Sequence, residues 1–255
     1  MKIGFLGTGH ITSSVIEGIF KSKLKITKIF ISPRNRLISK KLSKKFKKVT
    51  VSKNNQQLID KVNWVFLAIT PKVGHKILKK LQFKSNQKIV SFISTINIGK
   101  LKKYTKNKKV TRVIPMPFIG IKKGPIIICP KDKKVKNFFD KLGMTIEINN
   151  EIISKNFWTT SSFMAPFYQI MKTTSDWLVK RGVKRNEAQK YITSLFVALS
   201  EDSVINSKKH LKYLVSDSQT PKGLNEQAVK ELKKLHFYKS LEKSLNSIKK
   251  RLNKN

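Results

Sequence analysis

Two glycines near the amino terminus, Gly7 and Gly9, have the spacing of a phosphate-binding turn. They follow a short apolar segment, residues 2–6, and precede an amphipathic segment that begins at His10. The first glycine of such a pair allows a tight turn, and the second lets the backbone approach a pyrophosphate, which free N–H groups of the next helix can bind. We therefore predict a dinucleotide site at Gly7, Gly9, His10 and Ile11. The alternatives are a structural turn that binds no nucleotide and, for His10, a side chain that faces solvent.

The segment Ser32-Pro-Arg34-Asn-Arg36 lies at the end of the second predicted strand. Sites that prefer NAD carry Asp or Glu there, which binds the ribose 2′-hydroxyl. A hydroxyl and guanidinium groups would instead hold a 2′-phosphate. Two of only six Arg residues lie in this segment. We predict that Ser32, Arg34 and Arg36 bind the cofactor and that the cofactor is NADP, with NADPH preferred over NADH. The alternative is a solvated basic loop.

Other reactive side chains are too scattered to form a familiar site. Cys129 is the only cysteine, which excludes a disulfide within the chain and a thiolate metal cluster. The four His residues lie far apart and lack the spacing of metal ligands, so we predict no metal site. The sequence also shows neither a Ser-His-Asp set nor paired carboxylates. We assign no side chain a catalytic role in proton transfer or nucleophilic attack.

The chain of 255 residues is very basic, with 55 Lys and Arg against 14 Asp and Glu, a formal net charge of +41. Such a charge suggests a polyanion partner. However, 49 of these cations are Lys, spread over nearly every segment, whereas proteins that grip phosphates or bases usually enrich Arg. We interpret the charge as a lysine-covered surface without specific nucleic-acid binding. We see no signal peptide and no apolar stretch near the ~18 residues that span a bilayer, and expect a soluble, cytoplasmic protein without a membrane partner.

Short apolar segments alternate with amphipathic ones in the first part of the chain. The predicted strands are 2–6, 26–32, 49–51, 62–69, 88–93, 110–114 and 126–129. Between the first two, Ile11, Val15 and Ile19 are spaced four apart, as on one helix face. Strands that alternate with helices predict right-handed crossovers and a mainly parallel sheet. The fold class is therefore α/β in this part.

The pattern changes after about residue 148, beyond which we see no convincing strand. Phe157, Phe163, Phe167 and Ile170 fall at roughly helical spacing, and so do residues further on. We predict two domains, an α/β domain over 1–150 and an all-α domain over 151–255. A helical domain of about a hundred residues with so many aromatic side chains buries its apolar surface more easily against a second copy of itself. We expect a homodimer or a higher homo-oligomer through this domain.

Six short motifs, spread over nearly the whole chain, fall in an order and spacing that resemble one family. They are Ile3-Gly-Phe-Leu-Gly-Thr-Gly-His10, Val65-Phe-Leu-Ala-Ile-Thr-Pro-Lys72, Ser91-Phe-Ile-Ser94, Arg112-Val-Ile-Pro115, Ala165-Pro166 and Thr220-Pro-Lys-Gly-Leu-Asn225. Together they resemble pyrroline-5-carboxylate reductase. The resemblance implies a Rossmann-type NAD(P)-binding domain followed by a helical substrate and dimerisation domain. It also implies that Asn55, Ala68, Thr70 and Pro71 contact the cofactor.

The resemblance implies an activity as well, the reduction of a cyclic imine, 1-pyrroline-5-carboxylate, to proline by hydride from NADPH, a step of proline biosynthesis. The substrate carboxylate would bind at the turn formed by Thr220, Lys222, Gly223, Leu224 and Asn225, which resembles the Ser-Pro-Gly-Gly-Thr-Thr signature of the family. Here Lys replaces the first glycine, and Leu-Asn replaces the two threonines. Two alternatives stay open: a related oxidoreductase acting on another imine or a β-hydroxyacid, and a non-enzymatic nucleotide or nucleic-acid binder.

Overall fold

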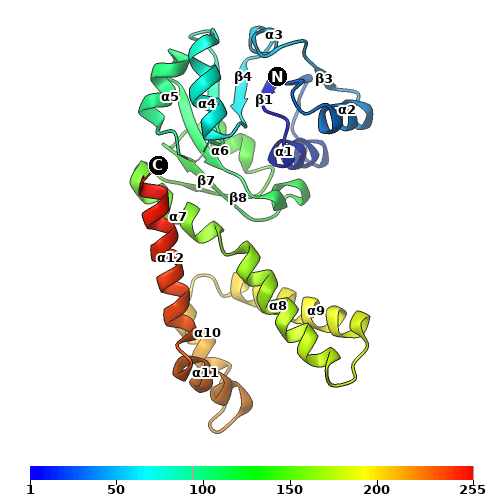
Figure 1. Ribbon diagram of the computed structural model, residues 1–255, viewed down its shortest axis with the longest axis vertical. Coiled ribbons are helices and arrows are strands. Elements are labelled where there is room, and N and C mark those ends of the chain that lie inside the picture. The colour runs from blue at the N-terminus through cyan, green and yellow to red at the C-terminus, as the bar shows by residue number, and fades with distance from the viewer. Residues whose placement is uncertain (94, 255) are drawn as a thin grey trace. The chain divides into compact units, whose positions relative to one another are not determined.

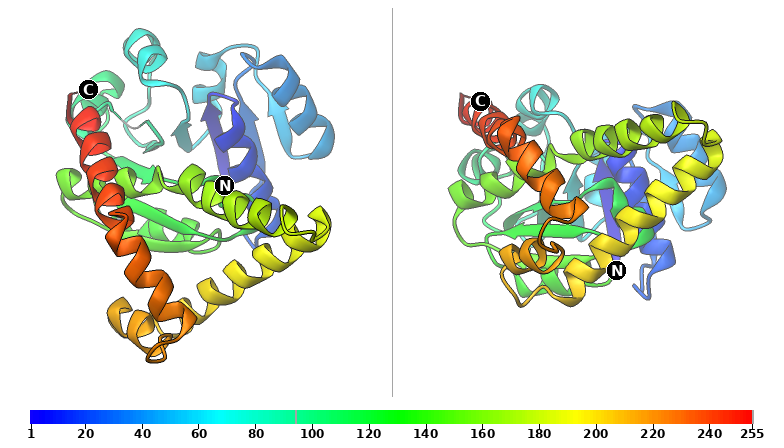
Figure 2. Two further views of the ribbon diagram at one scale, coloured as in Figure 1. Left: turned by 60° about the horizontal axis from the view of Figure 1, so that its bottom comes forward. Right: turned by 90° about the horizontal axis from the view of Figure 1, so that it is seen from below.

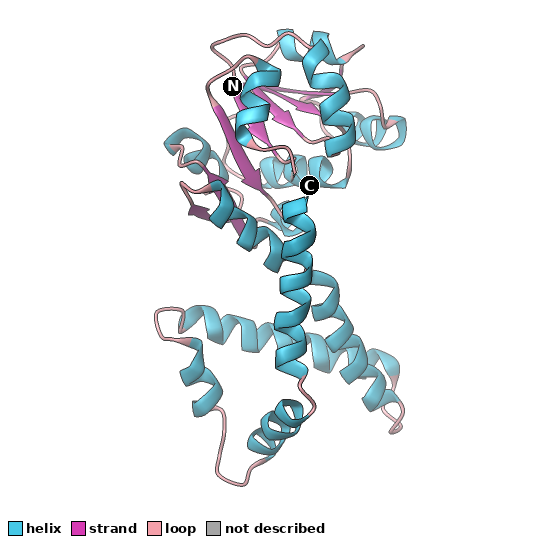
Figure 3. Ribbon diagram, turned by 60° about the vertical axis from the view of Figure 1, so that its left-hand side comes forward, coloured by secondary structure: helices cyan, strands magenta, loops and turns pink. Residues whose placement is uncertain are grey.

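The computed structural model describes residues 1–93 and 95–254, so Ser94 of the third motif and Asn255 lie outside the described residues. The described chain divides into two compact units. The first consists of Met1–Trp158 together with the last residues from Leu252 onward, and the second consists of Thr159–Arg251. The strands all lie in the first unit and the second is helical (Figure 3). This confirms the predicted fold class. The boundary at residue 150 stays a prediction, since the helix α7 (Glu151–Ser161) runs across the division between the units.

The first unit is built on one eight-stranded sheet with the order β3-β2-β1-β4-β5-β6-β7-β8. Every neighbouring pair of these strands is parallel except β6 and β7. The strands are β1 (Lys2–Leu6), β2 (Lys28–Ile31), β3 (Val49–Val51), β4 (Trp64–Leu67), β5 (Lys88–Ser91), β6 (Val110–Ile114), β7 (Pro125–Cys129) and β8 (Met144–Glu147).

Both faces of the sheet are buried. Side chains alternate between the two faces along each strand, so each strand contributes to both cores. Phe5 and Phe66 belong to the core on one face, whereas Leu6 and Val65 belong to the core on the other. Helices α1 (His10–Lys21), α2 (Arg36–Lys45) and α6 (Lys133–Phe139) cover the first face. The second face is covered by α3 (Asn55–Asp60), α5 (Ile98–Thr105), the short α4 (Pro71–Ile77) and the 3₁₀ turn η1 (Leu78–Lys80) (Figure 1).

The eighth strand, β8, was not predicted from the sequence. It pairs in parallel with β7, so that Ile127 lies opposite Ile146. As an edge strand it is only half-buried, and Met144 is 62% exposed. Its residues therefore lack the continuous apolar run that marks the central strands. The seven predicted strands are all present.

The second unit contains the helices α8 (Met164–Val179), α9 (Arg185–Ile205), α10 (Leu211–Asp217), α11 (Leu224–Lys234) and α12 (Phe237–Lys254) (Figure 2). α8 and α9 form a hairpin through a turn at Gly182, which has a φ of 92°. Many large apolar side chains of this unit stay exposed in the single chain, among them Tyr191, Leu199 and Ile205 of α9. None of the helices within 1–93 and 95–254 is long and apolar enough to cross a membrane.

Candidate cofactor and substrate sites

The turn after β1 is built around Gly7, which has a φ of 104°. A Cβ atom at this position would lie 2.1 Å from the backbone oxygen of Ala68, so only glycine fits here. Its N–H donates to Ser32 Oγ at 3.0 Å, and its carbonyl accepts from Thr12 Oγ1 at 2.8 Å. The turn is thereby held between the ends of β1, β2 and β4.

Gly9 is the residue before α1 and leaves the helix N-terminus open. It has extended backbone geometry, and its residue type supplies no side-chain cap. A Cβ atom at Gly9 would have no heavy atom within 4 Å. The first N–H groups of a helix have no partner within the helix and attract anions. His10 is exposed at the start of α1, and Ile11 follows it half-buried. This arrangement fits a pyrophosphate bound against the backbone.

The position of this turn in the sheet supports the same interpretation. β1 lies between β2 and β4, so the chain leaves β1 toward one side for β2 and β3 and toward the other for β4 and β5 (Figure 1). Such a reversal of strand order opens a crevice outside the carboxyl ends of the strands, where dinucleotides bind. Gly7 and Gly9 lie at this point.

The end of β2 carries the segment predicted to select NADP. Arg34 and Arg36 are exposed and line, with Asn35 and Leu37, a shallow hollow of about 530 Å³. Asn35 caps α2, because its side chain accepts a hydrogen bond from the Ile38 N–H at 3.2 Å. The two arginines thus lie at the start of a helix, where a phosphate is favoured.

Ser32 plays a part that the sequence did not reveal. It is 2% exposed, and its hydroxyl accepts from the Gly7 N–H. Thr8 Oγ1 donates to the Ser32 carbonyl at 2.7 Å. Ser32 and Thr8 therefore hold the glycine turn against β2. The direct contact of Ser32 with a cofactor stays a prediction.

The remaining predicted cofactor residues lie at the same edge of the sheet. Ala68 follows β4, and its N–H donates to the Leu6 carbonyl at 2.8 Å. Thr70 is the residue before α4, and Pro71 is the first residue of that helix. Asn55 is the first residue of α3, just beyond β3. Because the carboxyl ends of parallel strands meet at one edge, these residues share the edge that carries Gly7.

The predicted substrate turn lies in the second unit, at the start of α11. The Gly223 N–H donates to the Thr220 carbonyl at 2.8 Å, and Lys222 has a φ of 60°. Gly223 precedes the helix and provides no side-chain cap, so the first N–H groups of α11 have no partner within the helix. The Asn225 side-chain amide donates to the Ser218 carbonyl at 2.8 Å, and Leu224 is 84% exposed. The Lys222 N–H donates to Glu226 Oε2 at 2.7 Å, so the donors that remain for an anion are the first N–H groups of α11 and the Lys222 side chain.

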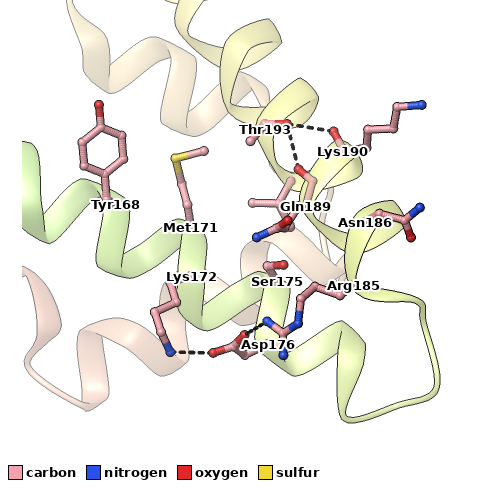
Figure 4. Close-up of a pocket in the computed structure, with 11 residues that line it drawn as sticks. Tyr168, Met171, Lys172, Ser175, Asp176, Arg185, Asn186, Gln189, Lys190 and Thr193 are labelled. Atoms are coloured by element: carbon pink, nitrogen blue, oxygen red, sulfur yellow. Dashed lines mark hydrogen bonds and ion pairs between the residues drawn. The ribbon is translucent and has the colours of Figure 1, made fainter.

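A pocket of about 780 Å³ lies between α8 and α9 within the second unit (Figure 4). Asp176 of α8 accepts from Lys172 Nζ at 2.6 Å and from Arg185 of α9 at 3.4 Å, which ties the two helices together. The hydrogen bond from Lys172 is the main reason that the pKa of Asp176 lies below its usual value. The sequence alone predicts no site at these residues. No group of His, Cys, Asp and Glu that could hold a metal is found in the described part of the chain.

Comparison with known proteins identifies both halves of the chain. Residues 2–98 match the family of NADP oxidoreductases described as coenzyme F420-dependent, and residues 153–254 match the pyrroline-5-carboxylate reductase dimerisation domain. The chain belongs to the pyrroline-5-carboxylate reductase family. No curated protein sequence matches it.

Solved structures of the same family share the fold over the whole chain. The 1-pyrroline-5-carboxylate reductase of Streptococcus pyogenes is 22% identical, with a TM-score of 0.85 over 100% of this chain and 99% of that one. The pyrroline carboxylate reductase of Plasmodium falciparum, solved with NADP bound, is 20% identical, with a TM-score of 0.84 over 99% of this chain and 97% of that one. A more distant likeness is an Aspergillus terreus imine reductase in complex with NADPH4, 11% identical, with a TM-score of 0.57 over 86% and 79% of the two chains.

Proposed function

We propose that this chain reduces 1-pyrroline-5-carboxylate to proline with NADPH. The observation that carries the proposal is the open helix N-terminus at Gly9, beside two exposed arginines at the end of β2. It agrees with the family of the chain and with the NADP held by the Plasmodium falciparum relative. NADPH supplies a hydride to the imine carbon, and the imine nitrogen ends the reaction protonated.

The protein's own contribution is to hold and orient the reactants. A protonated iminium already accepts hydride, so the chain needs neither a nucleophile nor a metal for this step. Gly7, Gly9 and the start of α1 would hold the pyrophosphate. Ala68, Thr70 and Pro71, which follow β4, would form the wall beside the nicotinamide, as the family resemblance implies.

The preference for NADPH is assigned to Arg34 and Arg36. A guanidinium can bind a phosphate through two parallel N–H bonds; because both arginines are exposed, we count the net worth of only one charge-assisted bond, about 1.5–3 kcal/mol, for the pair. For the double variant Arg34→Ala, Arg36→Ala we expect kcat/KM with NADPH to fall roughly a hundredfold. The value with NADH should change little. Equal losses with both cofactors would overturn this assignment.

The matched control for this experiment is the double variant Lys40→Ala, Lys41→Ala. These residues lie on the same helix α2, and their removal lowers the net charge by the same amount. If long-range attraction alone accounted for the preference, the two double variants would lose NADPH activity equally. A loss confined to the arginine variant supports a direct contact with the 2′-phosphate.

The substrate carboxylate is assigned to the turn before α11. Its backbone N–H groups and Lys222 supply donors and positive charge. NADPH oxidation that depends on 1-pyrroline-5-carboxylate tests the proposal, and no turnover at millimolar substrate would refute it. The same imine without the carboxylate, 1-pyrroline, should be reduced far less efficiently.

A second candidate is the reduction of a different imine on the same scaffold. It is favoured by the exposed Leu224 and by the bonded amide of Asn225, which stand where the family signature has two threonines. Equal or better turnover of an uncharged cyclic imine than of 1-pyrroline-5-carboxylate would decide for this candidate.

We further propose that the chain works as a homodimer through its helical unit. The match of residues 153–254 to a dimerisation domain and the exposed apolar side chains of α9 support it. A location in the cytoplasm stays a prediction.

A further inference from the structure

Arg112 is a charged residue in the middle of a buried strand. All five residues of β6 are buried, and the neighbours Val110, Val113 and Ile114 are apolar. Arg112 is 1% exposed, and within the described residues its Nε has no hydrogen-bond partner. Desolvation of an unpaired donor costs about 1–3 kcal/mol. A strand that only had to fill the core would be more stable with an apolar residue at this position.

The two forked ends of this guanidinium bind two different segments. Arg112 Nη1 donates to Glu151 Oε1 at 2.6 Å, and Nη2 donates to the carbonyl of Ile96. Glu151 is the first residue of α7, and its two carboxylate oxygens accept from the Ile98 N–H at 3.1 and 3.2 Å. Ile98 is the first residue of α5. Arg112 and Glu151 together therefore fix the end of the β5–α5 connection, on both sides of Asn97.

Ile96 connects the Arg112 guanidinium with α4, the helix that follows β4. It is fully buried, and it packs so closely on α4 that a Cβ atom at Gly74 would lie 2.9 Å from Ile96 Cδ1. The same α4 begins at Pro71, directly after Thr70, which is assigned to the nicotinamide side of the cofactor site. The connections after β4 and β5 leave neighbouring parallel strands at the cofactor edge of the sheet. Through Ile96, the guanidinium thus links the end of the β5–α5 connection to α4, the helix that follows β4.

We propose that Arg112, with Glu151, is a positioning residue for hydride transfer. It sets residues 96–98, before and at the start of α5, and through Ile96 the helix α4 at Gly74, as the support against which the nicotinamide ring is oriented. It acts through the Ile96 carbonyl and side chain and touches neither cofactor nor substrate. This inference rests on the proposed reductase function. Lysine cannot replace arginine here, because a single ammonium does not reproduce a planar fork that binds two acceptors on different segments.

The test is the kinetics of the full-length variant Arg112→Lys with NADPH and 1-pyrroline-5-carboxylate. A misplacement of about 1 Å can cost up to a hundredfold in rate, so we expect kcat to fall about tenfold to a hundredfold. Adenosine 2′,5′-bisphosphate, which carries only the half of the cofactor that binds at Arg34 and Arg36, should bind the variant within about twofold of the wild type. Unchanged kcat in a folded variant would overturn the inference.

Two further variants separate positioning from simple loss of stability. Glu151→Gln keeps an acceptor for Arg112 and Ile98 but removes the charge. It should also lower kcat, by a smaller factor than Arg112→Lys. It decides the question if Arg112→Lys does not fold. The control is Lys88→Met, which removes the ion pair with Asp132, whose two side chains are 16% and 17% exposed, at the amino end of β5, away from the cofactor edge.

The control should lower the melting temperature and leave kcat unchanged. If Lys88→Met lowers kcat as Arg112→Lys does, or if Arg112→Lys weakens the bisphosphate as much as it lowers kcat, the role of Arg112 is only structural and the inference fails. If the wild-type chain itself does not turn over the imine, the proposed function fails instead, so the two failures are distinguishable.

Discussion

Substitution by alanine is predicted to have different effects at the two glycines of the phosphate turn: it should lower the stability of the fold at Gly7 and the affinity for NADPH at Gly9. Gly7→Ala introduces a side chain at a φ of 104° and 2.1 Å from the Ala68 oxygen. A left-handed backbone costs a residue with a Cβ about 1–2 kcal/mol, and forcing an extra methyl into a filled site about 1–3 kcal/mol. We expect the free energy of unfolding to fall by about 2–5 kcal/mol.

Gly9→Ala meets neither obstacle, because Gly9 is extended and a Cβ atom there has open space. Alanine is a poorer residue than glycine before a helix, by up to about 1 kcal/mol, so the fold should be nearly as stable as the wild type. The added methyl group would, however, lie between the backbone and the pyrophosphate. The loss of one charge-assisted hydrogen bond alone corresponds to a Kd for NADPH at least about tenfold higher.

The assay is urea unfolding of both variants at one fixed protomer concentration, together with titration of NADPH fluorescence. The concentration must be fixed because a dimer's stability depends on it. A Gly9→Ala protein that binds NADPH like the wild type would refute the placement of the pyrophosphate at this turn. A Gly7→Ala protein within about 1 kcal/mol of the wild type would refute the steric argument for the turn.

Three further outcomes are expected. Lys222→Gly removes a non-glycine residue from a φ of 60° and should raise the free energy of unfolding by about 0.5–1 kcal/mol in urea. Burial raises the pKa of Asp132, but hydrogen bonds, first that from Lys88, outweigh this and hold the pKa below its usual value. The stability that Asp132 contributes is therefore present above about pH 4 and lost as the pH falls through its folded pKa. The difference in free energy of unfolding between the wild type and Asp132→Asn should therefore shrink steadily as the pH falls below about 4. Leu195→Glu on the exposed face of α9 should give a monomer in light scattering, whereas the exposed control Ser207→Glu stays dimeric.

The parts of the molecule that could be predicted from the sequence depend on local patterns. The apolar runs of the central strands mark a sheet buried on both faces, and a glycine pair between strand and helix marks the phosphate turn. At the first position of the turn only glycine fits for steric reasons, so the residue type alone indicates the turn. The arginines after β2 could be located in the same way, because the chain otherwise uses lysine.

Features that depend on contacts between distant residues could not be predicted. Nothing in the local sequence shows that Ser32 accepts from the Gly7 N–H, 25 residues away, or that Arg112 meets Glu151, 39 residues away. Nor does the local sequence show that His75 Nδ1 lies 2.9 Å from the hydroxyl of Tyr104, 29 residues away on α5. In each case the sheet brings the partners together, and only the order of its strands determines which residues meet.

The positions of arginine distinguish charges that bind a particular partner from the charge of the lysine-covered surface. Within residues 1–158 arginine occurs only at positions 34, 36 and 112. The first two border the hollow assigned to the 2′-phosphate, and the third binds acceptors on two segments with its forked end. Lysine, a flexible point charge, suits a solvated surface, but it does not bind two acceptors at fixed angles. The lysine surface attracts anionic cofactor and substrate, and salt screens this attraction beyond about 8–10 Å, whereas the ion pair of the buried Arg112 with Glu151 is screened much less. A chain that uses lysine for nearly all its other cations thus has arginine in this unit where the geometry of the donor, and not its charge alone, is required.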